Sequence, residues 1–116
     1  MTPLYDSQGE LVAWQDGNQL RNQDGDALFW IDSKGNVFDY EADYKGIWEH
    51  HHWRGLDGGV VVFREDASET GVTLPYLAGP PSPEPMAVPE PMLRPGATPG
   101  KRPLRRSEWS TYQPFQ

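Results

Sequence analysis

Cysteine is absent from the 116 residues of this chain. A disulfide framework, a thiolate nucleophile and a zinc site built on thiolates are therefore excluded. Proline is nearly absent from the first 70 residues, because Pro3 alone precedes Pro75 and the other prolines lie between residues 75 and 114. No segment approaches the ~20 apolar residues of a membrane helix, and the N-terminus lacks the basic and apolar regions of a secretory signal. These absences predict a cytoplasmic protein that does not enter a membrane.

Basic residues are also scarce in the first part of the chain. Residues 1 to 70 contain 14 Asp and Glu but only 5 Lys and Arg, a net charge of −9, whereas residues 71 to 116 carry +2. Nucleic-acid affinity depends largely on Lys and Arg that displace phosphate counterions. We therefore expect no nucleic-acid partner. Composition divides the chain into a body at 1–70, a proline-rich linker or arm at 71–103 and a terminus at 104–116.

The body contains a fourfold internal repeat, which is visible when the sequence is written in rows of 16 or 17 residues. The rows are LYDSQGELVAWQDGNQ (4–19), LRNQDGDALFWIDSKGN (20–36), VFDYEADYKGIWEHHH (37–52) and WRGLDGGVVVFREDAS (53–68). The first column is apolar, the sixth small, the eleventh large and apolar, and the thirteenth acidic. In row order these columns hold Leu4, Leu20, Val37 and Trp53; Gly9, Gly25, Ala42 and Gly58; Trp14, Trp30, Ile47 and Phe63; and Asp16, Asp32, Glu49 and Glu65. We expect the large column to be buried where the rows meet.

Each row predicts one β-hairpin with its turn at the small residue. Turn segments such as DSQGE and NQDGD supply Gly for positive φ and Asp or Asn for side-chain turns, and the flanks are aromatic and β-branched. No ten-residue run has the 3.6-residue spacing of a helix. Because an isolated hairpin is marginal in water, the hairpins should pack together and close. The sequence predicts an all-β fold: four consecutive β-hairpin repeats, eight antiparallel strands, around a pseudo-fourfold axis, followed by a Pro-rich extended tail.

These four hairpins resemble the bacterial 4-fold beta flower domain over about residues 3–68. The resemblance implies a small all-β fold with internal fourfold symmetry, and it implies no established activity. The third row departs most, with Ala42 in place of Gly, Ile47 in place of an aromatic residue and Gly46 inside the second strand. We expect any distortion of the symmetry in that row.

A second resemblance is to the YD or RHS repeats of bacterial toxin shells. It rests on Tyr5, Asp6, Gly9 and Leu11, in the order Y-D-x-x-G-x-L. Only the first row fits this motif well, and four rows are too few to form a shell.

All three histidines are adjacent, at residues 50–52. On a strand, His50 and His52 would point to one face and could share a metal ion with Glu49. Alternatively, the triplet is a polar turn between the third and fourth rows. The acidic column raises a related question, since a symmetric fold could gather its carboxylates into a cation-binding ring, although solvated acidic residues at strand ends are ordinary.

Most aromatic side chains must fill the core of so small a body. Trp48, Trp53 and Tyr40 are the candidates for an exposed groove that binds a sugar or a peptide. Catalysis has little support, because the body's serines lie at turn positions outside any GxSxG motif and no Cys-His pair exists. No cofactor is indicated.

The composition of residues 75–103 is typical of a polyproline-II linker. Its PPSP and PEP elements could dock in an aromatic groove, or the segment could be a spacer. The terminus contains Trp109, Tyr112 and Phe115, anchors that could bind the chain's own acidic body, a neighbouring subunit or another protein.

The sequence therefore favours a non-enzymatic protein-binding or assembly module that uses its tail to bind a protein partner or its own oligomer. The alternative is a small-ligand or metal-binding protein that uses an aromatic groove or the His triplet.

Overall fold

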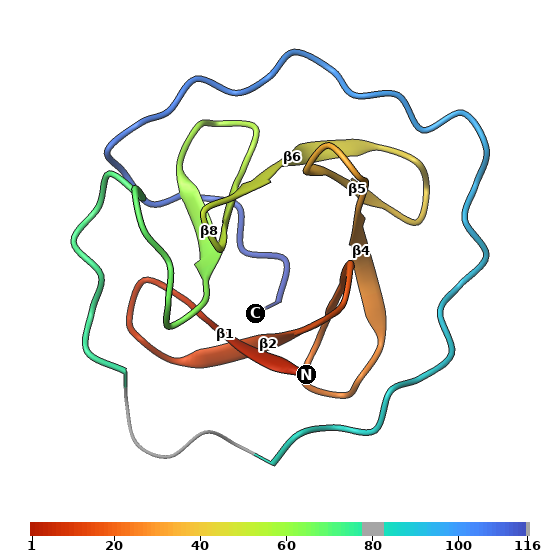
Figure 1. Ribbon diagram of the computed structural model, residues 1–116, viewed down its shortest axis with the longest axis horizontal. Coiled ribbons are helices and arrows are strands. Elements are labelled where there is room, and N and C mark those ends of the chain that lie inside the picture. The colour runs from red at the N-terminus through yellow and green to blue at the C-terminus, as the bar shows by residue number, and fades with distance from the viewer. Residues whose placement is uncertain (78–82, 116) are drawn as a thin grey trace.

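The structure is a computed structural model that describes residues 1–77 and 83–115. Eight strands pair antiparallel in chain order and form a closed barrel (Figure 1), with β1 returning to β8 through Tyr5 and Phe63. The strands are β1 (Thr2–Tyr5), β2 (Leu11–Asp16), β3 (Gln19–Arg21), β4 (Ala27–Ile31), β5 (Asn36–Asp39), β6 (Tyr44–Glu49), β7 (His52–Arg54) and β8 (Val60–Phe63). The predicted all-β fold of consecutive hairpins is confirmed. The described residues include no helix long and apolar enough to span a membrane.

The four hairpin turns share one main-chain geometry. In the first turn (residues 6–10), Gly9 N–H donates to the Asp6 carbonyl at 3.0 Å and Asp6 N–H donates to the Glu10 carbonyl at 3.0 Å. The same pair of bonds closes the second (22–26), third (39–43) and fourth (55–59) turns. The small residue has positive φ in each turn, 70° at Ala42 and between 77° and 88° at the three glycines. The third turn thus keeps the common geometry, and Ala42 adopts a conformation that usually requires glycine.

A β-bulge recurs at the same point of every hairpin. The strand register shifts directly after the first-column residue of each row: between Leu4 and Tyr5, Leu20 and Arg21, Val37 and Phe38, and Trp53 and Arg54. A bulge bends its strand and increases the local twist. Four equivalent bulges therefore help strands of three to six residues to close into a barrel.

The inner core of the barrel contains the first column of the repeat. Leu4, Leu20, Val37 and Trp53 have no exposed surface and belong to one cluster with residues such as Phe29. Side chains alternate between the two faces of a strand. The residue after each first-column residue therefore faces outward, and in row order these outward residues are Tyr5, Arg21, Phe38 and Arg54.

The large eleventh column forms a separate outer layer. Trp14, Ile47 and Phe63 are buried and Trp30 is half-buried, yet none belongs to the inner cluster. Phe63, for example, packs against Trp109 near the end of the chain, with ring centroids 5.7 Å apart. Three of the four side chains are buried as expected, but part of their cover comes from outside the repeat and not from the neighbouring rows.

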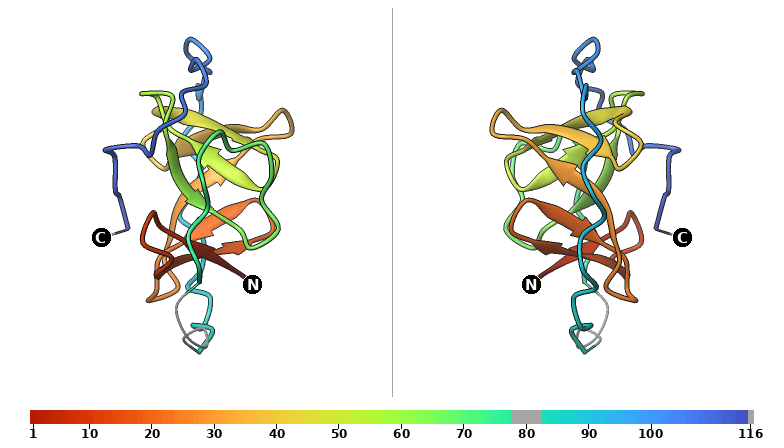
Figure 2. Two further views of the ribbon diagram at one scale, coloured as in Figure 1. Left: turned by 90° about the vertical axis from the view of Figure 1, so that its left-hand side faces the viewer. Right: turned by 90° about the vertical axis from the view of Figure 1, so that its right-hand side faces the viewer.

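The residues that cover this outer layer come after the barrel in the sequence. We call residues 71–77 and 83–106 the belt and residues 107–115 the terminal segment. Figure 1 shows the belt running around the outside of the barrel and the terminal segment lying over the barrel mouth. The side views in Figure 2 show the belt as a band around the middle of the barrel.

Candidate functional site

The belt contacts three of the four hairpin turns through main-chain carbonyls. A Cβ atom placed on Gly9, Gly25 or Gly58 would overlap a belt carbonyl oxygen, that of Tyr76, Met86 or Leu104 respectively. At the second turn Val88 N–H also donates to the Gly25 carbonyl at 3.1 Å, and at the fourth turn Arg106 N–H donates to the Gly58 carbonyl at 3.0 Å. Glycine adopts the positive φ of these turns at little cost, and the close approach of the belt leaves no room for a Cβ atom.

Two buried arginines fasten the belt to the second and fourth turns. Arg21 Nη1 donates to the carbonyls of Gly25 and Val88, both at 2.6 Å. Arg54 Nη1 donates to the equivalent carbonyls of Gly58 at 2.7 Å and Arg106 at 3.1 Å. Each guanidinium therefore joins a turn to the part of the belt that crosses that turn.

The third turn holds the belt differently. Its small residue, Ala42, carries the Cβ atom that the other turns lack, and the outward residue of its row is Phe38 in place of an arginine. An exposed ion pair joins Arg94 of the belt to Glu41 at 3.0 Å. Between Val88 and Arg106 the described structure has no main-chain hydrogen bond from belt to barrel. The hydrogen bonds and ion pairs from this arc to the barrel come from side chains, such as that of Arg94.

Glu49 is a third point of attachment. Its carboxylate accepts hydrogen bonds from Arg105 at 2.9 and 3.1 Å and lies 3.5 Å from Arg54 Nε. Burial alone would raise the pKa of Glu49, but the hydrogen bond and charge of Arg105, with the charge of Arg54, outweigh it and lower the pKa. Glu49, one of the expected metal ligands, is thus occupied by belt arginines.

His50 and His51 form the turn between β6 and β7 and have positive φ, and His52 begins β7. His50 lies at the surface with Nε2 2.7 Å from Glu69, whereas His52 is fully buried with Nε2 3.2 Å from Arg54 Nη2. Burial and then the charge of Arg54 lower the pKa of His52, so its imidazole is a neutral acceptor. Among residues 1–77 and 83–115 no three His, Cys, Asp or Glu side chains are grouped to hold a metal ion.

Other members of the acidic column have separate partners. Asp16 pairs with Arg21 at 3.1 Å. Asp32 accepts hydrogen bonds from the main chain and side chain of Asn36, both at 2.9 Å. Burial alone would raise the pKa of Asp32, but its hydrogen bonds outweigh the effect of burial and lower the pKa. These two carboxylates stabilise local structure.

The three aromatic groove candidates occupy different environments. Trp53 is fully buried and its indole N–H donates to the Lys45 carbonyl at 2.9 Å, so it offers no surface. Trp48 is half-buried against the inner cluster. Tyr40 is half-buried near Glu90 of the belt, and burial followed by the charge of Glu90 raises the pKa of its hydroxyl.

The terminal segment packs on the barrel of its own chain. The ring centroids of Tyr112 and Phe115 lie 5.9 and 6.2 Å from that of Trp53, and Phe115 lies 5.7 Å from Phe29. Trp109 forms a parallel bridge with Val60 of β8. The anchors expected from the sequence therefore contact residues of the barrel.

Polar contacts at the fourth turn fix the same segment. The Asp57 carboxylate accepts hydrogen bonds from Ser110 Oγ at 3.0 Å and Thr111 N–H at 3.1 Å. Burial alone would raise the pKa of Asp57, but its hydrogen bonds lower the pKa overall. The fourth turn is therefore bound by both the belt and the terminal segment.

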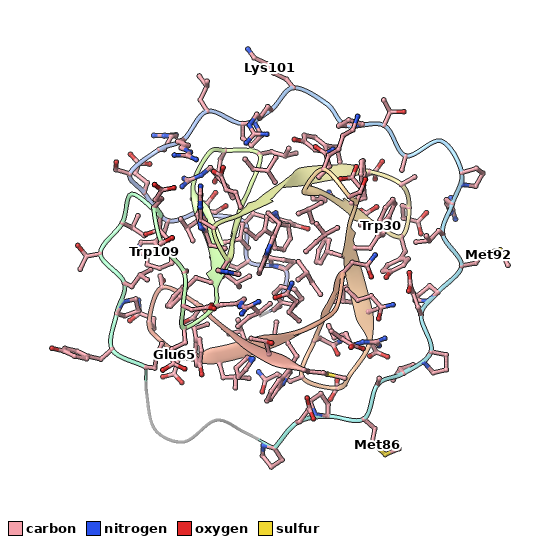
Figure 3. All side chains as sticks on the ribbon, in the orientation of Figure 1. Trp30, Glu65, Met86, Met92, Lys101 and Trp109 are labelled. Carbon is pink, nitrogen blue, oxygen red and sulfur yellow. The ribbon has the colours of Figure 1, made fainter. Side chains whose placement is uncertain are left out.

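Large apolar side chains of the belt point away from the barrel. Tyr76, Met86, Met92 and Leu104 are 99, 90, 91 and 78% exposed. Figure 3 shows Met86 and Met92 projecting outward, while Trp30 lies inside the belt. Three of the four are the residues whose carbonyls cover the turn glycines. The contacts that fix the belt thus present its apolar side chains to solvent.

The protein thus consists of four hairpins with equivalent turns and bulges, enclosed by the belt and the terminal segment. A family model described as 4-fold beta flower protein matches residues 2–115. The chain belongs to the 4-fold beta flower family. The match covers the belt as well as the barrel, so it extends well beyond the residues that carried the resemblance. For this beta flower protein, searches among curated proteins and solved structures gave no match.

Sequence reasoning missed the two buried arginines. Both occupy the second column, in rows two and four, and that regularity was available as a signal. It also missed the three carbonyl contacts, although each contact residue follows a proline, at Pro75, Pro85 and Pro103.

Proposed function

We propose that this beta flower protein is a non-enzymatic protein-binding or assembly module, with its four hairpins related by a pseudo-fourfold axis. We retain the division into 1–70, 71–103 and 104–116 as a division of roles, with the barrel as scaffold and the rest as the part that binds. The carrying observation is the set of exposed apolar side chains on the belt. Because the barrel holds the belt backbone in place, these side chains would lose little conformational entropy when they bind a partner.

The test is substitution of the exposed side chains, because deletion of the tail would uncover the outer layer of the barrel. We expect Y76S/M86S/M92S/L104S to keep the wild-type melting temperature, since none of these side chains packs in the core. Molar mass by light scattering and quantitative co-purification from cells would be compared with wild type and with K34S/E65S, which alters exposed polar residues. If Y76S/M86S/M92S/L104S alone loses an oligomer or specific co-purified proteins, the proposal is supported. Identical results for all three proteins would contradict it.

A second candidate is small-ligand binding at the barrel mouth. Lys45, Leu56, Asp57, Thr111 and Tyr112 line a hollow of ≈ 230 Å³. An exposed tyrosine beside a carboxylate suits a sugar or a short peptide. A sugar or peptide that raises the melting temperature of wild type but not of Tyr112→Ala would favour this function. The metal alternative is tested in the same way with Zn²⁺ and Ni²⁺, using His50→Ser.

A further inference from the structure

The belt contains the tetrapeptide Pro-Glu-Pro-Met twice, at residues 83–86 and 89–92. A polyproline-II segment has three residues per turn and rises about 3.1 Å per residue, so a six-residue repeat is two full turns. Equivalent residues of the two copies should then point the same way, about 19 Å apart.

The glutamates of both copies point toward the barrel. Glu84 binds the N-terminal amino group of Met1. Glu90 accepts a hydrogen bond from the Gln19 side chain, which in turn accepts one from Arg21. Between them, Val88 is fixed by its main-chain bond to Gly25. The segment therefore has three attachments within seven residues on its inner side.

The methionines of both copies point outward, as Figure 3 shows. They share a three-residue spacing with exposed prolines, which gives one outer line along the segment. We call this line the ridge, and it consists of Pro83, Met86, Pro89, Met92 and Pro95. Among the described residues, no ring or side chain covers the ridge methionines, which are the second and third most exposed of the large apolar side chains.

We propose that the ridge is the ligand for a partner protein with an aromatic-lined groove of the kind that binds polyproline-II segments. Such grooves bind PxxP segments, whose prolines are three residues apart, and the ridge presents its side chains at that spacing. Methionine sulfur makes favourable contacts with aromatic rings. Because the barrel already holds the backbone, binding loses less conformational entropy than it would with a free proline-rich chain.

This inference rests on the proposed function and names the chemistry of its partner. An aromatic groove is favoured over a charged one because both glutamates already bind residues of the barrel and Arg94 is paired with Glu41. The ridge itself contains only Pro and Met.

The experiment is a titration of the full-length, isotope-labelled protein with a panel of purified SH3, WW and EVH1 domains. We expect at least one domain to bind with micromolar affinity and to shift the amide resonances of the non-proline residues between 84 and 94. M86S/M92S should lower that affinity about tenfold or more. The matched control is Y76S/L104S, which removes two equally exposed belt side chains outside the ridge and should bind as wild type does.

Absence of binding by every domain, or equal binding by M86S/M92S and wild type, would overturn the inference. The two proposals also separate from each other in the co-purification assay. If Y76S/L104S loses the specific partners and M86S/M92S keeps them, the protein-binding function stands and the ridge is not its site. Thermal unfolding of both variants verifies that the fold is unchanged.

Discussion

The third and fourth hairpin turns close with the same main-chain bonds but hold the belt in different ways. The fourth turn offers Gly58, with no Cβ atom, and the buried Arg54, whose guanidinium reaches both the turn and the belt. The third turn offers Ala42 and Phe38, and its link to the belt is an exposed ion pair. Attachment of the belt at the fourth turn therefore depends on a missing Cβ atom and a buried guanidinium, in addition to apolar cover.

The largest effect should come from removing the guanidinium at the fourth turn. Arg54→Met would leave the buried carbonyl of Thr70 and the partly buried carbonyl of Arg106 without the donors that reach them at 2.9 and 3.1 Å. We expect a loss of about 3 kcal/mol or more in the free energy of unfolding, measured by urea denaturation. Arg94→Met, at the third turn, is the control and should cost less than about 1 kcal/mol because its ion pair is exposed. Equal losses would remove the distinction between the turns.

A methyl group at a contacted glycine should have the next largest effect. Gly25→Ala adds a Cβ that overlaps the Met86 carbonyl, in a residue with φ of 88°. We expect a loss of about 2 kcal/mol in the free energy of unfolding. The left-handed conformation itself costs an L-residue about 1 kcal/mol, and the overlap with the belt carbonyl accounts for the rest. Gly17→Ala isolates that conformational cost, since Gly17 has φ of 59° and nothing within 4 Å of its Cβ position. If both variants lost the same stability, the close approach of the belt would have no energetic role.

Acid should destabilise the protein through His52, which contacts the guanidinium that holds the fourth turn. The pKa of buried His52 is lowered from 6.5, so below about pH 6.5 the unfolded chain binds a proton that the folded chain resists. Stability is complete above this pH and declines as pH falls, by up to about 1.4 kcal/mol per pH unit for one proton. His52→Gln should flatten this part of the profile in urea denaturation between pH 7 and 5. An unchanged slope would assign the acid sensitivity to other groups.

The smallest effect should be a gain at the third turn. Ala42→Gly relieves an alanine held at φ of 70° and should raise the free energy of unfolding by up to about 1 kcal/mol. The control Ala67→Gly changes a residue without positive φ and should give no gain. Thermal or urea unfolding of both variants makes the comparison. A loss of stability in Ala42→Gly would show that the alanine methyl group contributes packing that outweighs its strain.

Much of the barrel could be predicted because its signals are local. Gly9, Gly25 and Gly58 mark their turns through positive φ, and Leu4, Leu20 and Val37 mark the inner face through regular spacing. The assignment of the eleventh column was less complete. The large side chains in this column predicted burial. Which face of the strand they occupy depends on the four bulges, and no residue pattern predicted those bulges.

The candidate site was harder to predict because it joins residues far apart in the chain. Met86 is 61 residues from Gly25, and Leu104 is 46 residues from Gly58. The expected metal ligands also have a different role in the structure. His52 and Glu49 were proposed as metal ligands from their spacing, and both contact Arg54.

The sequence by itself determined the number of hairpins, the position of each turn and the residues able to occupy the inner core, because those properties follow from local backbone preference and from the alternation of side chains along strands. Only the tertiary structure decided where the proline-rich part lies and which of its side chains face solvent. Proline-rich segments contain few signals of their own, since they form neither helix nor ladder. Their path is set by the glycines, arginines and carbonyls that they meet on the finished barrel.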